Sequence, residues 1–297
     1  MAKPTLKSND YTKDPTSFTL ETDDSYFIRE TVAYVKGTPA THAEAVTVIV
    51  WFHGFYVNNR TTLFNDLPGK EVKLLANLKS CPIKELIFIA PFMGYVKPAE
   101  FVLDKDKQKI PVRNKKGEII PDRFQMWNPG STQYRDVEAK LGKEADNYLA
   151  KVLEGLANFL DSQGQALKTS DGKGASAFTI KNLIVACHSG GGVAMRAFVS
   201  GLGNNNTAAL KGSWCFDCLY ENPKFWFNQA TNAAPFYVYY WGTAVNAQNL
   251  LGLMGHPNQA QFSQPGDALH VIDNSTKDHY RTASEGFAER LANVKLP

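Results

Sequence analysis

The sequence predicts an α/β fold with a mostly parallel central sheet that is flanked by helices on both faces. Continuous runs of β-branched and aromatic residues, such as Val46–Phe52 and Glu85–Ala90, are typical of strands buried on both faces. Segments with helical periodicity separate these runs, and alternation of strands and helices indicates a parallel sheet. No internal repeat or change of composition divides the 297 residues, so we expect one domain over 1–297.

The first third of the chain contains the expected sheet edge and a long insert. Residues 1–17 are polar and are expected to form a flexible arm. Phe18–Leu20 and Tyr26–Lys36 are expected to form an edge meander, and a helix is expected near Lys70–Leu78. After the strand that ends near Ala90, residues 94–137 carry several prolines and no long periodic pattern, so we expect an insert or lid.

The clearest helix is Ala139–Leu160, whose apolar residues recur at steps of three and four and therefore predict one buried face. The chain then alternates again between strands and helices. The remaining expected elements are a strand at Lys181–Cys187, a helix from about Gly191 to Val199, strands at Ser213–Leu219, Pro235–Trp241 and Leu269–Asp273, and a helix that starts near Tyr280.

Composition excludes several classes of protein. The net charge of +3 is too small to imply a nucleic-acid partner, and the lysine-rich stretch Lys105–Lys116 is better interpreted as a solvated hairpin. The apolar runs are far shorter than the ~20 residues of a membrane-spanning helix, so no transmembrane segment is expected. The first residues show no secretory signal, which favours the cytoplasm unless Met1 begins a trimmed mature chain. The oligomeric state cannot be deduced from these features.

No pattern in the sequence indicates a cofactor or a metal. No phosphate-cradling glycine-rich loop follows a strand, and no metal-ligand motif such as H-E-x-x-H is present. Cys215 and Cys218 form a lone C-x-x-C within an apolar run, without the second pair or the nearby histidines of a zinc site. We therefore expect packed core thiols.

The segment that points most directly to chemistry is IKNLIVACHSGGGVAMRAF, residues 180–198. An apolar strand leads directly into Ser189, and a helix begins at once. This pattern resembles the nucleophile elbow of the α/β-hydrolase superfamily, normally G-x-S-x-G. Gly191 supplies the second small position, whereas Cys187 replaces the first glycine. The resemblance implies that Ser189 is a nucleophile and that the Gly190 N–H contributes to an oxyanion hole; the alternative is a glycine-rich helix cap.

A second segment supports the same resemblance. His53-Gly54-Phe55 follows the buried strand Val46–Phe52. In the superfamily, a pair of this kind at the end of the third strand forms the other wall of the oxyanion hole. The resemblance therefore assigns an N–H donor to Phe55 and a structural role to His53.

The general base and its acid are expected after the serine, in the order Ser, Asp or Glu, His. His279 follows the last expected strand and precedes the final helix, where the resemblance places the base. No Asp or Glu occurs between Glu221 and Asp267, so the usual position of the acid is empty. Asp217, a carboxylate in an apolar run, is our choice for the acid, and Asp273 is the alternative.

The resemblance implies a serine hydrolase, similar to carboxylesterases and lipases, that cleaves a carboxylic ester through Ser189, His279 and Asp217 without a cofactor. The expected partner is a small-molecule or lipid-like ester. A peptidase or amidase with the same triad remains an alternative, as does a non-catalytic binding protein on the same fold.

Overall fold

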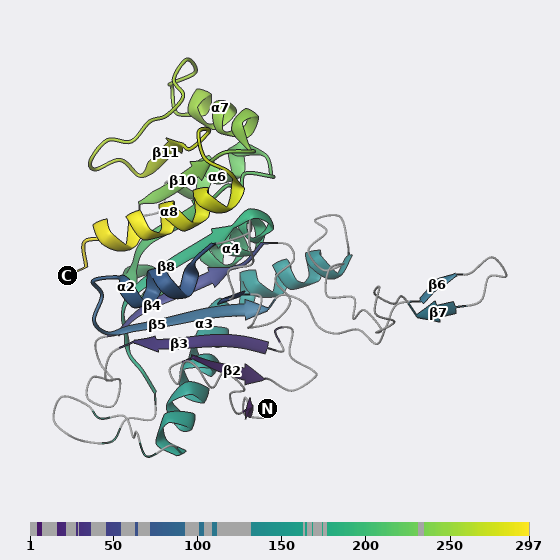
Figure 1. Ribbon diagram of the computed structural model, residues 1–297, viewed down its shortest axis with the longest axis vertical. Coiled ribbons are helices and arrows are strands. Elements are labelled where there is room, and N and C mark those ends of the chain that lie inside the picture. Colours follow the sequence, from purple (N-terminus) through teal and green to yellow (C-terminus); the bar gives the residue numbers. More distant parts are fainter. Residues whose placement is uncertain are drawn as a thin grey trace.

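The computed structural model describes residues 5–7, 17–21, 28, 30–36, 46–54, 63–64, 72–92, 101–103, 109–111, 132–162, 164, 168, 174, 177–230 and 235–296. Its main feature is a nine-stranded sheet with the order β1-β2-β3-β5-β4-β8-β9-β10-β11 (Figure 1). These strands are β1 (Thr5–Lys7), β2 (Ser17–Glu21), β3 (Glu30–Lys36), β4 (Val46–Phe52), β5 (Leu86–Phe92), β8 (Ile180–His188), β9 (Leu210–Phe216), β10 (Phe236–Tyr240) and β11 (Leu269–Asp273).

The sheet is parallel from β5 to β11 and antiparallel at its N-terminal edge. β5, β4, β8, β9, β10 and β11 pair in parallel. β2 and β3 pair antiparallel as the expected edge meander, and β3 pairs antiparallel with β5. Within the expected flexible arm, by contrast, β1 adds an antiparallel strand to β2. The predicted fold class is therefore confirmed. Because the central strands are parallel, their carboxyl ends all meet at one edge of the sheet.

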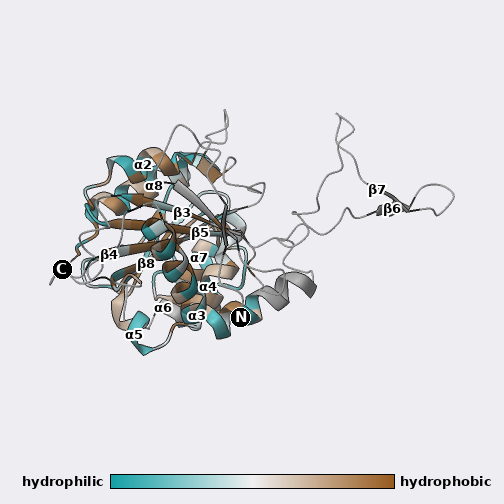
Figure 2. Ribbon diagram, turned by 90° about the horizontal axis from the view of Figure 1, so that it is seen from below, coloured by the Kyte–Doolittle hydropathy of each residue, from teal (hydrophilic) through white to brown (hydrophobic). Residues whose placement is uncertain are grey.

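Helices cover both faces of the sheet. α2 and α8 lie side by side on one face, whereas α3 and α4 pack together on the other, where α6 and α7 also lie (Figures 1 and 2). The helices are α2 (Leu74–Ser80), α3 (Thr132–Ser162), α4 (Gly192–Ser200), α5 (Asn204–Ala209), α6 (Pro223–Ala230), α7 (Ala244–Leu253) and α8 (His279–Asn293).

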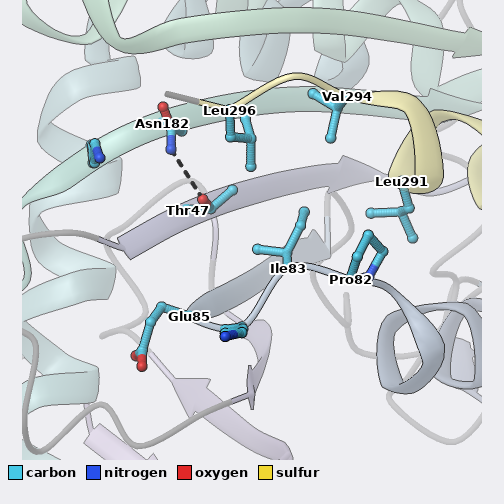
Figure 3. A pocket seen from close by; sticks show the side chains of 10 residues that line it. Thr47, Pro82, Ile83, Glu85, Asn182, Leu291, Val294 and Leu296 are labelled. Carbon is cyan, nitrogen blue, oxygen red and sulfur yellow. Dashed lines mark hydrogen bonds between the residues drawn. The ribbon is translucent and has the colours of Figure 1, made fainter.

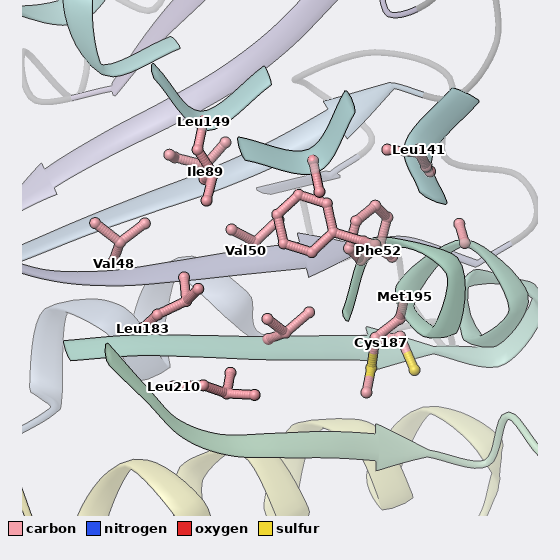
Figure 4. Close-up of a cluster of buried hydrophobic side chains, with 14 of the residues drawn as sticks. Val48, Val50, Phe52, Ile89, Leu141, Leu149, Leu183, Cys187, Met195 and Leu210 are labelled. Atoms are coloured by element: carbon pink, nitrogen blue, oxygen red, sulfur yellow. The ribbon is translucent and has the colours of Figure 1, made fainter. Parts of the chain in front are cut away.

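The core is divided by the sheet into two hydrophobic clusters. On the face of α3 and α4, side chains such as Phe52, Met195 and Leu149 are buried together (Figure 4). On the face of α2 and α8, Trp51 lies with its ring 5.1 Å from that of Phe287. Every residue of β4 and β5 is buried, as the continuous apolar runs predict. β4, one of these fully buried strands, pairs with β8, the strand that leads into Ser189.

Several boundaries differ from the sequence-based expectation. β9 covers Leu210–Phe216 instead of Ser213–Leu219, because Asp217 has a positive φ and the chain leaves the sheet there. α3 begins at Thr132, so the end of the expected 94–137 insert is helical. Within that insert, β6 (Phe101–Leu103) and β7 (Lys109–Pro111) form a separate antiparallel pair. No helix in the described part of the chain has the length and apolar character needed to cross a membrane.

Candidate active site

Ser189 lies in a sharp turn between β8 and α4. Ser189 has a φ of +52°, a left-handed conformation that is unfavourable for a residue with a side chain. It is the first residue of a single turn of 3-10 helix, Ser189–Gly191. Gly191 is required here, because a Cβ atom would lie 2.2 Å from the Phe52 carbonyl oxygen. The predicted small residue is therefore explained by the contact between the turn and β4, and the strain indicates a site under functional constraint.

Gly54 brings the end of β4 against the same turn. A Cβ atom on Gly54 would lie 2.7 Å from the Cβ atom of Ser189, so only glycine allows this approach. The neighbouring His53 is buried, and its Nδ1 forms a hydrogen bond of 2.9 Å with the Gly54 carbonyl oxygen. Burial lowers the pKa of His53 to about 4, despite that hydrogen bond, so its ring is neutral at pH 7.

Asp217 and His279 form a close pair at the same edge of the sheet. His279 Nδ1 and Asp217 Oδ2 are 2.6 Å apart, and Asp217 is fully buried. The other carboxylate oxygen accepts hydrogen bonds from the Trp241 N–H and from the N–H and hydroxyl of Thr243. Burial raises the pKa of Asp217, but the hydrogen bonds from His279 and the backbone outweigh it and lower the pKa to about 2. Asp217 is therefore ionised and holds His279 through Nδ1.

His188 connects the serine turn with the His279 turn. Its Nε2 lies 3.2 Å from the His279 carbonyl oxygen, and its ring centroid lies 4.4 Å from that of His279. Burial and the charge of His279 lower its pKa to about 3, although Asp217 and the hydrogen bond oppose the shift. A neutral His188 therefore donates Nε2–H to this carbonyl. No motif in the sequence points to this bridge, which joins residues 91 positions apart.

Two aromatic residues lie beside the serine and the histidine. Tyr220 is 53% exposed, and its phenol lies close enough to the Ser189 side chain to interact with it. The Trp241 ring lies 6.4 Å from the His279 ring and is also exposed. In the described part of the chain no hydrogen bond joins Ser189 to His279. No sequence motif identifies either aromatic residue as part of this site.

The turns at the carboxyl ends of the parallel strands place four of the expected site residues at one edge of the sheet. Ser189 and Gly190 follow β8, Asp217 follows β9, and His279 begins the helix after β11. Asp273, the alternative acid, instead accepts a hydrogen bond of 2.7 Å from the Ser275 N–H. Phe55, the expected second oxyanion donor, lies outside the described residues.

Three cysteines gather below this edge of the sheet. The sulfur atoms of Cys187, Cys215 and Cys218 lie within 4.8 Å of one another, and all three residues are buried and free. The Met195 sulfur lies 3.9 Å from that of Cys215. Four sulfur atoms of this kind are chemically able to hold a soft metal ion, but three thiolates in an apolar core beside ionised Asp217 would bury several negative charges together. This arrangement fits packed thiols better than a metal centre.

Comparisons with known proteins give structural matches of low similarity. No model of a protein family matches this sequence, and no curated protein gives a significant match. An S-formylglutathione hydrolase from Agrobacterium tumefaciens has a TM-score of 0.44 at 11% identity, over 98% of this chain and 97% of that chain. The LpqC poly(3-hydroxybutyrate) depolymerase from Bordetella parapertussis has a TM-score of 0.44 at 15% identity, over 95% and 90%. An IroE-like serine hydrolase from Shewanella oneidensis has a TM-score of 0.41 at 11% identity, over 93% and 78%.

The fold is recognised from the strand order and the position of Ser189 within it. β3 is antiparallel to β5, the strands from β5 to β11 are parallel, and helices cover both faces. The serine lies on a left-handed turn between a central strand and the helix that follows it. With these features, the chain has the α/β-hydrolase fold.

Proposed function

We propose that this protein is a serine hydrolase that cleaves a carboxylic ester through an acyl-enzyme intermediate. The observation that carries the proposal is the pairing of His279 with ionised Asp217 at the edge where Ser189 lies on its strained turn. A nucleophile, a base and a group that orients the base are the three parts that acyl transfer requires.

In the proposed mechanism, the Ser189 hydroxyl turns toward His279 Nε2 when substrate binds. Ser189 Oγ attacks the ester carbonyl carbon while His279 takes the hydroxyl proton, and His279 then returns the proton to the leaving alcohol. Asp217 remains ionised and stabilises the imidazolium that forms. Water then attacks the carbonyl carbon of the acyl-enzyme while His279 takes a proton from it. His279 passes this proton to Ser189 Oγ as the acyl group leaves, which regenerates Ser189.

The oxyanion of the tetrahedral intermediate needs preorganised N–H donors. The Gly190 N–H, at the start of the segment that leads into α4, is one donor in this proposal, and the Phe55 N–H is the other. Each such donor contributes roughly 3 kcal/mol to transition-state stabilisation. The close approach of Gly54 to Ser189 supports a donor from the end of β4.

Labelling with a fluorophosphonate, followed by mass spectrometry, tests the proposal directly. We expect a single adduct on Ser189 in the wild-type protein and none in Ser189→Ala. Hydrolysis of 4-nitrophenyl acetate should show the same dependence on Ser189. A folded wild-type protein without an adduct and without turnover would overturn the proposal in favour of a binding protein. An anilide with the same acyl group separates esterase from amidase activity.

A further inference from the structure

A polar cleft adjoins the candidate nucleophile. It has a volume of about 650 Å³ and lies between the loop after β9 and helix α7. Tyr220 is the link between the two sites, since it lines the cleft, lies three residues after Asp217 and interacts with the Ser189 side chain. A molecule bound in the cleft would therefore reach the reacting hydroxyl past Tyr220.

Six of the eight residues that line this cleft carry hydrogen-bonding groups on their side chains. Three asparagines contribute amide groups, and Lys224 contributes an ammonium group. Pro223 and Leu253 supply the apolar lining, whereas Tyr220 offers an exposed aromatic ring. The complete lining is Tyr220, Glu221, Asn222, Pro223, Lys224, Asn246, Asn249 and Leu253.

The walls of the cleft are held in place by contacts within the protein. Asn246 on α7 donates a hydrogen bond to the Leu219 carbonyl oxygen, which fixes the helix to the loop that carries Tyr220. Glu221 is paired with Arg196 at 2.9 Å, so its charge is already compensated. Asn249 lies on the exposed side of α7, and its side chain forms no hydrogen bond within the described part of the chain. Its amide is therefore available to a ligand.

The polar groups that line the cleft favour some classes of ester over others. A long alkyl chain in the cleft would remove amide and ammonium groups from water without giving them partners, which is unfavourable. A sugar or polyol instead offers hydroxyl groups to the amides and a C–H face to the Tyr220 ring. Ligand sites are typically ~300–1,000 Å³, so a cleft of about 650 Å³ accommodates one or two sugar rings.

We propose that this cleft is a subsite for the alcohol portion of an acylated sugar or polyol, with Asn249 and Tyr220 as its specificity-determining residues. The proposal rests on the proposed serine hydrolase function, since it names the substrate class of that site. In the reaction, the bond between the acyl carbon and the sugar oxygen breaks as the acyl group is transferred to Ser189 Oγ. The sugar oxygen receives the proton from His279.

The test compares two acetate esters with the same acyl group, an acetylated methyl glucoside and butyl acetate, by measuring acetate release. We expect wild-type protein to have the higher kcat/KM for the glucoside. Asn249→Leu should lower the ratio of the two kcat/KM values by about 5- to 10-fold, the effect of one lost hydrogen bond. Asn205→Leu on α5, an exposed asparagine outside the cleft, should leave the ratio unchanged.

A binding measurement separates failure of this proposal from failure of the proposed function. Ser189→Ala should bind the acetylated glucoside in calorimetry, and the added Asn249→Leu change should weaken that binding by a similar factor. Binding without turnover in the wild-type protein would support the subsite and overturn the hydrolase function. Turnover with a preference for butyl acetate, or with the same ester ratio in Asn249→Leu and wild type, would overturn the subsite alone.

Discussion

The two ends of the parallel strands differ sharply, although the same strands build both. At the amino ends, a cleft of about 530 Å³ lies between the starts of the strands and the end of α8 (Figure 3). Asn182 Nδ2 donates to Thr47 Oγ1 at 3.3 Å there, whereas Asn182 Oδ1 and Glu85 Oε2 are buried without a hydrogen-bond partner in the described part of the chain. The described residues that line this cleft include no histidine and no residue with a positive φ.

At the carboxyl ends, strained and titratable residues are concentrated. Ser189 and Asp217 have φ values of +52° and +45°, and both are buried. The third non-glycine residue with a positive φ in the described part of the chain, Lys73, is exposed at the start of α2. The rings of His188 and His279 lie against each other beside the two turns, tilted by 40°.

The comparison shows that cavity size alone does not locate a site of chemistry. Both ends of the sheet have a cleft of several hundred Å³. Only the carboxyl ends combine backbone strain with a buried carboxylate that orients a histidine, which are features expected where stability is sacrificed for function. Substitutions at the two ends should therefore have unlike effects.

The largest predicted difference is in kcat, between Ser189→Ala at the carboxyl ends of the strands and Lys181→Ala at their amino ends. Removal of the nucleophile should lower kcat for 4-nitrophenyl acetate by about 10⁴- to 10⁶-fold, with little change in the midpoint of thermal unfolding because alanine adds no atoms. Lys181, an exposed residue of the amino-end cleft, should be replaceable without loss of kcat. Comparable rates for Ser189→Ala and wild type would contradict the proposed mechanism.

The next largest effect separates the two candidate acids. Asp217→Asn should lower kcat by about 10⁴-fold, because an amide at this position favours the wrong tautomer of His279. Asp273→Asn should change kcat little, since that carboxylate caps the Ser275 N–H instead. Steady-state kinetics of the two variants decides the assignment, and a large loss in Asp273→Asn alone would reverse it.

Two glycine substitutions extend the comparison to the stability of the fold. Gly191→Ala should destabilise the fold by at least about 2–3 kcal/mol, since its Cβ atom would collide with the end of β4. Gly252→Ala, within α7 and with no atom closer than 4 Å to the added Cβ, should stabilise it by about 0.5–1 kcal/mol. Urea unfolding of both variants measures the difference; equal stabilities would show that the serine turn tolerates a side chain.

Local patterns explain which parts of the site could be predicted. The serine turn is contiguous in sequence, so Ser189, Gly190 and Gly191 were found together with the strand and helix that flank them. The long apolar runs of β4 and β5 likewise identify central strands without any knowledge of their partners. The β9 boundary was wrong because apolar residues continue past Phe216, while the backbone leaves the sheet at Asp217.

Contacts between distant segments could not be predicted in the same way. His188 reaches a carbonyl 91 residues away, and Thr243 donates to a carboxylate 26 residues before it. No sequence motif identifies these two contacts, because a histidine or a threonine can form hydrogen bonds with many different partners. The short helices α5, α6 and α7 were also missed.

The last predicted effect concerns pH and two buried histidines whose rings are neutral, His53 and His188. His53 and His188 have pKa values of about 4 and about 3 in the folded protein, against 6.5 as the ordinary value. Below pH 6.5 the unfolded chain therefore binds protons that the folded protein does not, and stability falls as pH decreases toward 4. Asp217, with a pKa of about 2, contributes to this loss only at still lower pH.

Between pH 7 and pH 5 each of these histidines should lower the free energy of unfolding by about 2 kcal/mol. His188→Gln removes one titrating ring while keeping a side chain able to donate to the His279 carbonyl oxygen, so about half of this pH-dependent loss should disappear. Urea unfolding of both proteins at the two pH values measures the loss. An identical loss in the variant and the wild type would mean that His188 is charged in the fold, and a charged His188 with its ring 4.4 Å from that of His279 would oppose formation of the imidazolium that the proposed mechanism requires.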